Sequence, residues 1–304
     1  MRQNHLSGLI GFLMLLLIVS GCANQQAGSV EGAATGKPVI VATFFPLAQA
    51  TQAVVGDTAT VISLVPAGSE PHDYEPTPSD AANLERARAF VTLGVEFAPF
   101  EDQLASSTQA TVVRAGANIS VLGGFQEEGS NAIGVDPHIW NSPKNMMVMT
   151  HNIADQLAVV DPAQATSYHA NAEAYVQVLT QLDQEFAQGL ANCTKHTVIV
   201  NHQAFAYLGR DYNFTQVAIS GFSPDSEPTP NQIKKLVDTA RAENITYILT
   251  ESLVDPRTAD TIAQETGATT LVLDPLEGTK DPNATYVSIM RDNLKVLRTA
   301  LDCT

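Results

Sequence analysis

The stretch that decides the fold is residues 161–190, DPAQATSYHANAEAYVQVLTQLDQEFAQGL. Its first two residues are typical of a helix start, with Asp161 as the N-cap and Pro162 in the first turn. From there to Gly189 the stretch has no glycine and no further proline, and its apolar residues recur at helical spacing. About 28 residues at a rise of 1.5 Å each make a helix of roughly 42 Å. The sequence therefore predicts one long helix in the middle of the chain.

An alternating α/β pattern precedes this helix and restarts after it. Short apolar runs, each typical of a buried strand, are separated by helical stretches; the runs lie at 39–44, 60–65, 89–93, 111–114, 197–200, 246–250 and 270–273. Strands that alternate with helices form parallel sheets. We therefore expect an α/β fold of two lobes, residues 38–160 and 191–304. Each lobe has a mostly parallel sheet flanked by helices, and the long helix at 161–190 joins them.

The first 37 residues have the composition of an export signal followed by a tether. Arg2 precedes an apolar run, Leu9 to Val19, which has the length of a signal-peptide core. A membrane span would need about 20 apolar residues. The small residues before Cys22 resemble a bacterial lipobox, in which the cysteine is lipidated. We expect a signal peptide at 1–21 and a lipidated tether at 22–37, so that a lipid alone holds the exported body at the membrane, at the cell surface or in the periplasm. The alternative is a plain secretory leader with an incidental Cys22.

The net charge excludes one class of partner, and the cysteine content predicts a disulfide. Lys and Arg number 16 against 32 Asp and Glu, a net charge of −16, which excludes nucleic acid as a partner because phosphate binding needs clustered cations. An exported chain meets an oxidising compartment, where cysteines pair. After Cys22, the remaining cysteines are Cys193 and Cys303. We favour a disulfide between them, with free buried thiols as the alternative.

Four side chains that could bind a metal follow predicted strands. In open α/β sheets, ligands gather outside the carboxyl ends of the strands. The residues at such positions are His72, His138, His202 and Asp274. Three imidazoles and a carboxylate form a four-coordinate nitrogen and oxygen set that suits zinc, with manganese or iron as further options. Each residue alone also has an ordinary explanation, as a solvated or backbone-bonded histidine or a turn aspartate.

Longer motifs around these residues resemble a known family. The most specific is VPAGSEPHDYEPTPSD at 65–80, supported by DPHIW at 136–140, His202 with Ala204-Phe205, and LDPL at 273–276. With them, the segment from about 38 to 304 resembles the metal-binding substrate-binding lipoproteins of ABC importers, of the zinc-uptake type. The resemblance implies two lobes joined by a rigid helix and metal ligands at His72, His138, His202 and Asp274. Glu251, in Thr250-Glu251-Ser252, either orients a ligand or is simply a strand-end carboxylate.

Two departures from the family pattern concern the metal. Many zinc members carry a long histidine-rich loop ahead of the DPH segment, and here residues 123–135 contain no histidine. Manganese members usually have glutamate at the third ligand position, where this chain has His202. Because the coordinating atoms decide the metal more directly than an accessory loop, we expect Zn²⁺ as the ligand, and Mn²⁺ or Fe²⁺ less so.

The resemblance implies capture of a metal ion without chemistry. The partners would be an ABC permease and its ATPase, and we expect a monomer that is not an enzyme. Two ligands from each half would clamp the lobes together, and affinity should fall below a pH of roughly 6.5, the unperturbed imidazole pKa. One rival is an exported zinc-dependent hydrolase, which would need three ligands, an open water position and a general base. Another is a surface adhesin that contains a metal.

Overall fold

The structure, a computed structural model, describes residues 36–95, 97–126, 133–224 and 228–304. The chain divides at Gly36, and every element below lies in the unit formed by residues 37–304. The expected signal peptide, Cys22 and nearly all of the expected tether lie outside the described residues. Within the described ranges, no helix is long and apolar enough to cross a bilayer.

The first half contains a parallel sheet with the strand order β2-β1-β3-β4. Its strands are β1 (Val39–Ala42), β2 (Thr60–Ser63), β3 (Ala87–Thr92) and β4 (Thr111–Arg114). The helices α1 (Phe45–Val55), α2 (Pro78–Glu85) and α3 (Pro99–Ser107) connect them. The central strand β1 is almost wholly buried because its residues are apolar on both faces.

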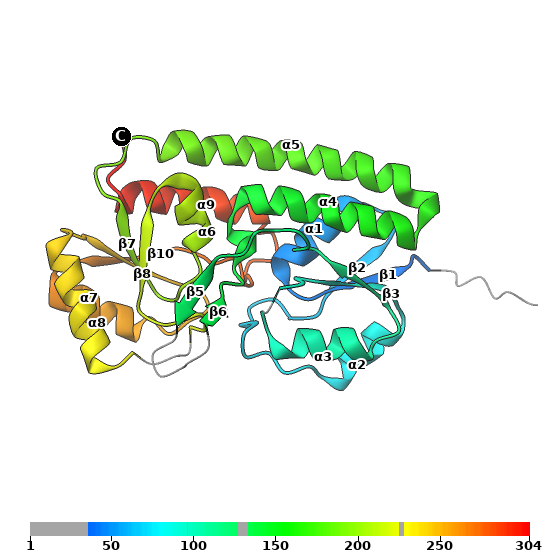
Figure 1. The fold of residues 1–304 in the computed structure, drawn as a ribbon, viewed down its shortest axis with the longest axis horizontal. Coiled ribbons are helices and arrows are strands. Elements are labelled where there is room, and N and C mark those ends of the chain that lie inside the picture. Colours follow the sequence, from blue (N-terminus) through cyan, green and yellow to red (C-terminus); the bar gives the residue numbers. More distant parts are fainter. Residues whose placement is uncertain (1–35, 96, 127–132, 225–227) are drawn as a thin grey trace, which may run out of the picture. The chain divides into compact units, whose positions relative to one another are not determined.

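The second half repeats the architecture with the order β10-β9-β7-β8, also parallel (Figure 1). Its strands are β7 (Thr197–Val200), β8 (Thr215–Ala218), β9 (Tyr247–Thr250) and β10 (Thr269–Val272). Its helices are α6 (Ala206–Tyr212), α7 (Pro230–Ala242), α8 (Arg257–Thr266) and α9 (Tyr286–Ala300). The predicted fold of two mostly parallel α/β lobes is thereby confirmed. The sequence pattern did not predict β8 or the antiparallel ribbon of β5 (Gly123–Gln126) and β6 (Ile133–Val135).

A long helix joins the halves, but it begins later than the sequence predicts. Helix α5 spans Ala165–Gly189, and the Pro162–Gln164 stretch before it is a 3₁₀ turn, η2. The carboxylate of Asp161 does not cap the helix; it accepts a hydrogen bond from Arg88 Nη1 at 3.3 Å. The expected N-cap is therefore wrong, and the carboxylate pairs with Arg88 instead. Helix α5 packs on α1 and on α4 (Pro143–Val160) of the first half, and on α9 of the second (Figure 1).

One apolar core runs through both halves and under α5. It includes Val41 and Phe90 from the first sheet, Leu179 from α5, and Val200 and Leu297 from the second half. A smaller cluster fills the space between the second sheet and helices α7 and α8. Because α5 contributes buried side chains along its length, it is part of the core rather than an exposed connector.

A disulfide joins the start of the second half to the end of the chain. Cys193, just after α5, is bonded to Cys303 at the end of the chain, 110 residues away. The backbone around them also pairs, since Thr194 N donates to Asp302 O and Lys195 N donates to Leu301 O. The predicted Cys193–Cys303 bridge is confirmed.

Candidate metal centre

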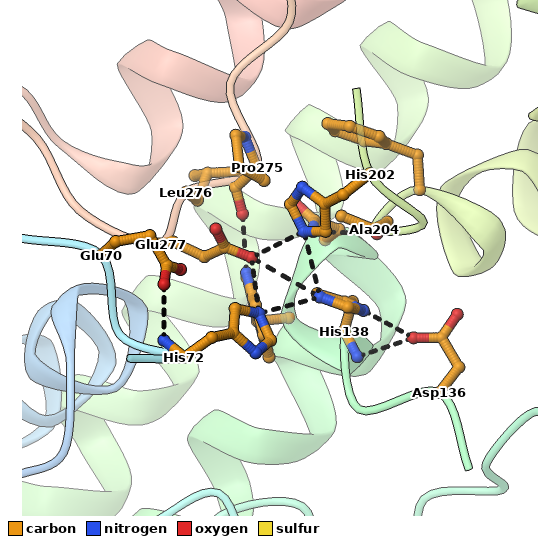
Figure 2. A network of polar contacts seen from close by, with 12 residues as sticks. Glu70, His72, Asp136, His138, His202, Ala204, Pro275, Leu276 and Glu277 are labelled. Atoms are coloured by element: carbon orange, nitrogen blue, oxygen red, sulfur yellow. Dashed lines mark hydrogen bonds and ion pairs between the residues drawn. The ribbon is translucent and has the colours of Figure 1, made fainter. Parts of the chain in front are cut away.

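Four side chains point their ligand atoms at one another between the two sheets (Figure 2). They are His72, His138, His202 and Glu277, and their ligand atoms all lie within 4.8 Å of one another. His138 Nε2 lies 3.3 Å from both His72 Nε2 and His202 Nε2. Glu277 Oε1 lies 3.1 Å from His202 Nε2, 3.3 Å from His72 Nε2 and 3.5 Å from His138 Nε2. The four donors therefore surround one small volume.

Each of the four residues is placed by a strand end. His72 lies in the loop after β2, His138 between β6 and the 3₁₀ turn η1 (Ile139–Asn141), His202 directly after β7, and Glu277 after β10. The cluster is closed to solvent, because the side chains of His138 and His202 are 0% exposed, that of Glu277 2% and that of His72 8%. His72, His202 and Glu277 thus lie beyond the carboxyl ends of parallel strands, whereas His138 follows a strand of the antiparallel ribbon.

The structure places Asp274 outside this cluster. Its carboxylate accepts hydrogen bonds from Ser252 Oγ and from Leu276 N, both at 2.8 Å. The second bond closes an Asx-type turn at Pro275 and Leu276, and Leu276 takes the left-handed conformation at φ +61°. That turn directs Glu277 inward. Glu277 therefore replaces Asp274 as the carboxylate of the cluster, and Asp274 has the turn role that is common for an aspartate before proline.

Two buried carboxylates orient two of the histidines. Asp136 Oδ1 lies 2.8 Å from His138 Nδ1 and also accepts from His138 N at 2.9 Å. Glu251 Oε1 lies 2.7 Å from His202 Nδ1 and accepts from His202 N at 3.1 Å. An ionised carboxylate only accepts, so Nδ1 carries the proton and Nε2 is left as a metal donor. Glu251 thus contacts the site through His202, which is the first of the two roles considered for it.

Among the described residues, His72 has no such carboxylate on its ring nitrogen Nδ1, and hydrogen bonds to its backbone hold it in position. Glu70 Oε2 accepts from His72 N at 3.0 Å and from Asp73 N at 3.2 Å, which fixes the turn that carries the imidazole. The ring of Phe97 lies edge-on to the His72 ring, with centroids 4.9 Å apart. Sequence reasoning missed Glu70, Asp136 and Glu277. For Asp136 and Glu70 the available signal was a carboxylate two residues before a candidate histidine.

The negative charge of Glu277 and the positive charge of a protonated His202 stabilise each other. Burial favours the neutral imidazole of His202, but the charges of Glu251 and Glu277 outweigh it and raise the pKa of His202 well above its usual value. Burial also disfavours an ionised Glu277, yet the charge of His202 and hydrogen bonds from the three histidines hold the pKa of Glu277 well below its usual value. A protonated imidazole therefore offsets a buried carboxylate.

His138 and His72 differ in the same environment. Burial is the largest influence on His138 and opposes its protonation, but the hydrogen bonds to Asp136 and Glu277 and the charge of Asp136 together outweigh it and raise the pKa of His138. For His72, burial wins and its pKa is lowered. A divalent cation can replace the protons on His202 and His138 and pair with the same carboxylates. The site is consequently built for a cation.

The donor chemistry favours zinc over harder metals. Three imidazole nitrogens and one carboxylate oxygen match the tetrahedral sets that bind Zn²⁺, whereas Mg²⁺, Ca²⁺ and Mn²⁺ prefer mostly oxygen donors. Aromatic rings line the site, with the Trp140 ring 5.1 Å and the Phe222 ring 6.2 Å from the His138 ring. Such a shell limits the access of water and strengthens the attraction between the cation and its ligands.

The family follows from a comparison of the sequence with family models. Residues 40–300 match the model of ZnuA, described as zinc-uptake complex component A, periplasmic. The match covers both sheets, α5 and all four residues of the cluster. The chain belongs to the ZnuA family. The match includes the His₃Glu cluster, a donor set of the kind that suits zinc.

Individual relatives agree with this assignment. The chain is 34% identical over 99% of its length to the zinc-binding lipoprotein AdcA of Streptococcus pneumoniae, of which it spans 62%. It is 33% identical to the high-affinity zinc uptake system protein ZnuA of Bacillus subtilis, with 97% of each chain covered. Among solved structures, it resembles a mutant of the laminin-binding adhesin Lmb of Streptococcus agalactiae, with a TM-score of 0.80, 31% identity, and 88% of this chain and 100% of that one covered.

Proposed function

We propose that this protein is the extracytoplasmic binding component of an ABC importer and that it captures Zn²⁺ between its lobes. The observation that carries the proposal is the buried cluster of three imidazoles and one carboxylate, with Nδ1 of two of its rings held by further carboxylates. A metal ion gives up its bound water molecules when it enters a buried site. Four protein donors are needed to replace those waters if the ion is to bind tightly.

Delivery requires partners in the membrane. The names of the Streptococcus pneumoniae and Bacillus subtilis relatives, a zinc-binding lipoprotein and a zinc uptake system protein, support a role in uptake. We infer that a cognate permease, driven by its ATPase, receives the ion, and that a lipid on Cys22 keeps the monomer near that permease. Mn²⁺ and Fe²⁺ bind less tightly in this proposal because they gain less from three imidazoles.

A catalytic zinc site is the less favoured interpretation. A hydrolase needs an open coordination position and a free general base beside the metal. In this chain four donors converge, and the nearby carboxylates of Asp136 and Glu251 are engaged with histidine Nδ1 atoms. The resemblance to an adhesin concerns the shared fold, whereas the donor cluster specifically supports metal capture, so we propose transport rather than catalysis or adhesion.

A zinc titration against a competing chromophoric chelator tests the proposal. The metal-free protein should bind one Zn²⁺ per chain and bind Mn²⁺ more weakly. His202→Ala should lower the affinity for Zn²⁺ by roughly 10²-fold or more, because four ligands share a binding free energy of about 10–16 kcal/mol. The matched control is His196→Ala, an exposed histidine six residues earlier, which should bind like the wild type. No zinc binding by the wild type, or undiminished binding by His202→Ala, would contradict the proposal.

A further inference from the structure

The segment that carries His138 is hydrogen-bonded to the second half of the chain, although it precedes α5 in the sequence. Tyr207 Oη donates to Asp136 O at 2.6 Å, and Trp140 Nε1 donates to Pro275 O at 2.8 Å. Three more bonds join the same segment, residues 136–142, to the second half: Tyr286 Oη to Trp140 O at 2.8 Å, Asn141 Nδ2 to Ala204 O at 3.1 Å, and Ser142 Oγ to Asp211 Oδ2 at 2.5 Å.

The rest of the first half is joined to the second half much more sparsely. Within the described part of the chain, residues 38–121 make two polar contacts with the second half. One is the contact between His72 and Glu277 in the cluster, and the other runs from Tyr286 N to Gln49 Oε1 at 3.4 Å. A cavity of about 300 Å³ also lies between the loop at 65–67 and the loop at 277–279.

Outside the cluster and the α4 that they lead into, residues 136–142 share one hydrogen bond with the described residues of the first half, from Asp136 N to Leu122 O at 2.9 Å, together with apolar packing. The Trp140 ring packs against the rings of Phe44 and Phe97, with centroids 4.8 Å and 5.2 Å apart. Apolar contact is non-directional and tolerates small sliding, whereas hydrogen bonds weaken steeply when their geometry changes. Five side-chain hydrogen bonds join the segment to the second half. The one bond on the other side goes to Leu122, whose own N donates to Tyr207 Oη of the second half. These bonds therefore fix His138 relative to His202 and Glu277 more firmly than the remaining contacts fix it relative to His72.

We propose that the site is divided unequally: His138, His202 and Glu277 form one preassembled three-donor set on the second half, and His72 is the single donor that the first half adds and withdraws. This inference rests on the proposed function and specifies its order of events. Zinc binds first to the three donors, and the loop that carries His72 then closes the fourth position. Along the chain each half supplies two ligands, as expected, and the proposed division of three and one concerns how those ligands are held.

Tyr207 of α6 is, in the same proposal, a positioning residue for His138. Its side chain is fully buried, and its hydroxyl donates to Asp136 O while accepting from Leu122 N at 2.9 Å. Asp136 in turn holds His138 through both Nδ1 and N. The hydroxyl thus acts on the metal donor through one intermediate residue. Partners of this kind are typically worth 10–100-fold in metal affinity.

Zinc affinities and release rates of single-ligand variants test the division. His72→Ala should keep measurable binding, weakened roughly 10²-fold mainly through faster release, because three donors remain assembled. His138→Ala and His202→Ala should each bind at least about tenfold more weakly than His72→Ala, since they break the preassembled set. If the wild type binds zinc but His72→Ala loses as much affinity as His138→Ala, the division is wrong. A wild type that binds no zinc contradicts the proposed function itself.

A double-mutant cycle tests Tyr207. Tyr207→Phe should weaken zinc binding about tenfold in the wild type and in His72→Ala, and should have no further effect in His138→Ala. An equal loss in the His138→Ala background would show a general structural effect and overturn the positioning role. The control is Tyr212→Phe in the same helix, which removes a buried hydroxyl that donates to Asp183 Oδ1 at 2.8 Å and should leave zinc affinity unchanged.

Discussion

Replacing Glu277 with glutamine lowers the affinity for zinc by roughly 10²- to 10³-fold, about the share of one donor in a four-donor site plus the loss of its charge. Glutamine preserves the shape of the side chain but is neutral and a weaker ligand. The effect is large because Glu277 is 2% exposed and contacts all three histidines, so that no solvent screens the lost charge.

The matched control is Asp274→Asn, three residues earlier and partly buried. Asparagine retains an oxygen that can accept from Leu276 N, so the turn that directs Glu277 inward persists. We expect zinc affinity within a few fold of the wild type, about 1 kcal/mol or less, as for the change of one hydrogen bond outside the donor set. Competition titrations of both variants make the comparison. A large loss in Asp274→Asn with little loss in Glu277→Gln would reverse the assignment.

Zinc affinity should rise with pH over a window that extends above the ordinary imidazole pKa. The pKa of His202 is raised well above its usual value and that of His138 is raised as well, so these rings hold protons that zinc must displace. Below the raised pKa of His202, each displaced proton changes the affinity by about tenfold per pH unit. The loss of affinity therefore begins at a higher pH than the value of roughly 6.5 expected for unperturbed histidines.

Calorimetric titrations in buffers with different ionisation enthalpies measure the protons released. Near neutral pH we expect about one to two protons released per zinc, from His202 and His138. His72 contributes little there, because burial lowers its pKa and keeps it neutral. The variant Glu251→Gln removes one of the two charges that raise the pKa of His202, so it should shift the window to lower pH. An affinity that is independent of pH between about 6.5 and 8, with no proton release, would contradict this description.

The sequence identified those features that depend on local pattern. The strands, the long helix and the three histidines follow from apolar runs, helical periodicity and the positions just after strands. His72 and His138 each follow a proline in a distinctive motif, and His202 lies two residues beyond a buried strand. For His72 and His202, local signals sufficed because a parallel sheet brings its strand ends to one edge, whereas His138 follows the antiparallel strand β6 and was marked by its motif alone.

The features that local sequence patterns did not predict depend on contacts between residues far apart in the chain. Glu277 enters the cluster only because Asp274 bonds to Leu276 N and Leu276 adopts a positive φ, which is uncommon for leucine. Asp161 bonds to Arg88, 73 residues away, and does not cap the helix. The attachment of His138 to the second half rests on Tyr207, Tyr286 and Asp211, whose proximity no local pattern reveals.

A crystal structure of the zinc-loaded protein, with anomalous diffraction at the zinc edge, is the most direct test of the central claim. We expect a single zinc peak with Nε2 of His72, His138 and His202 at about 2.0–2.1 Å and a carboxylate oxygen of Glu277 at about 2.0–2.2 Å. A zinc ion bound by Asp274 instead of Glu277, or a crystal grown with zinc that shows no peak at this cluster, would contradict it.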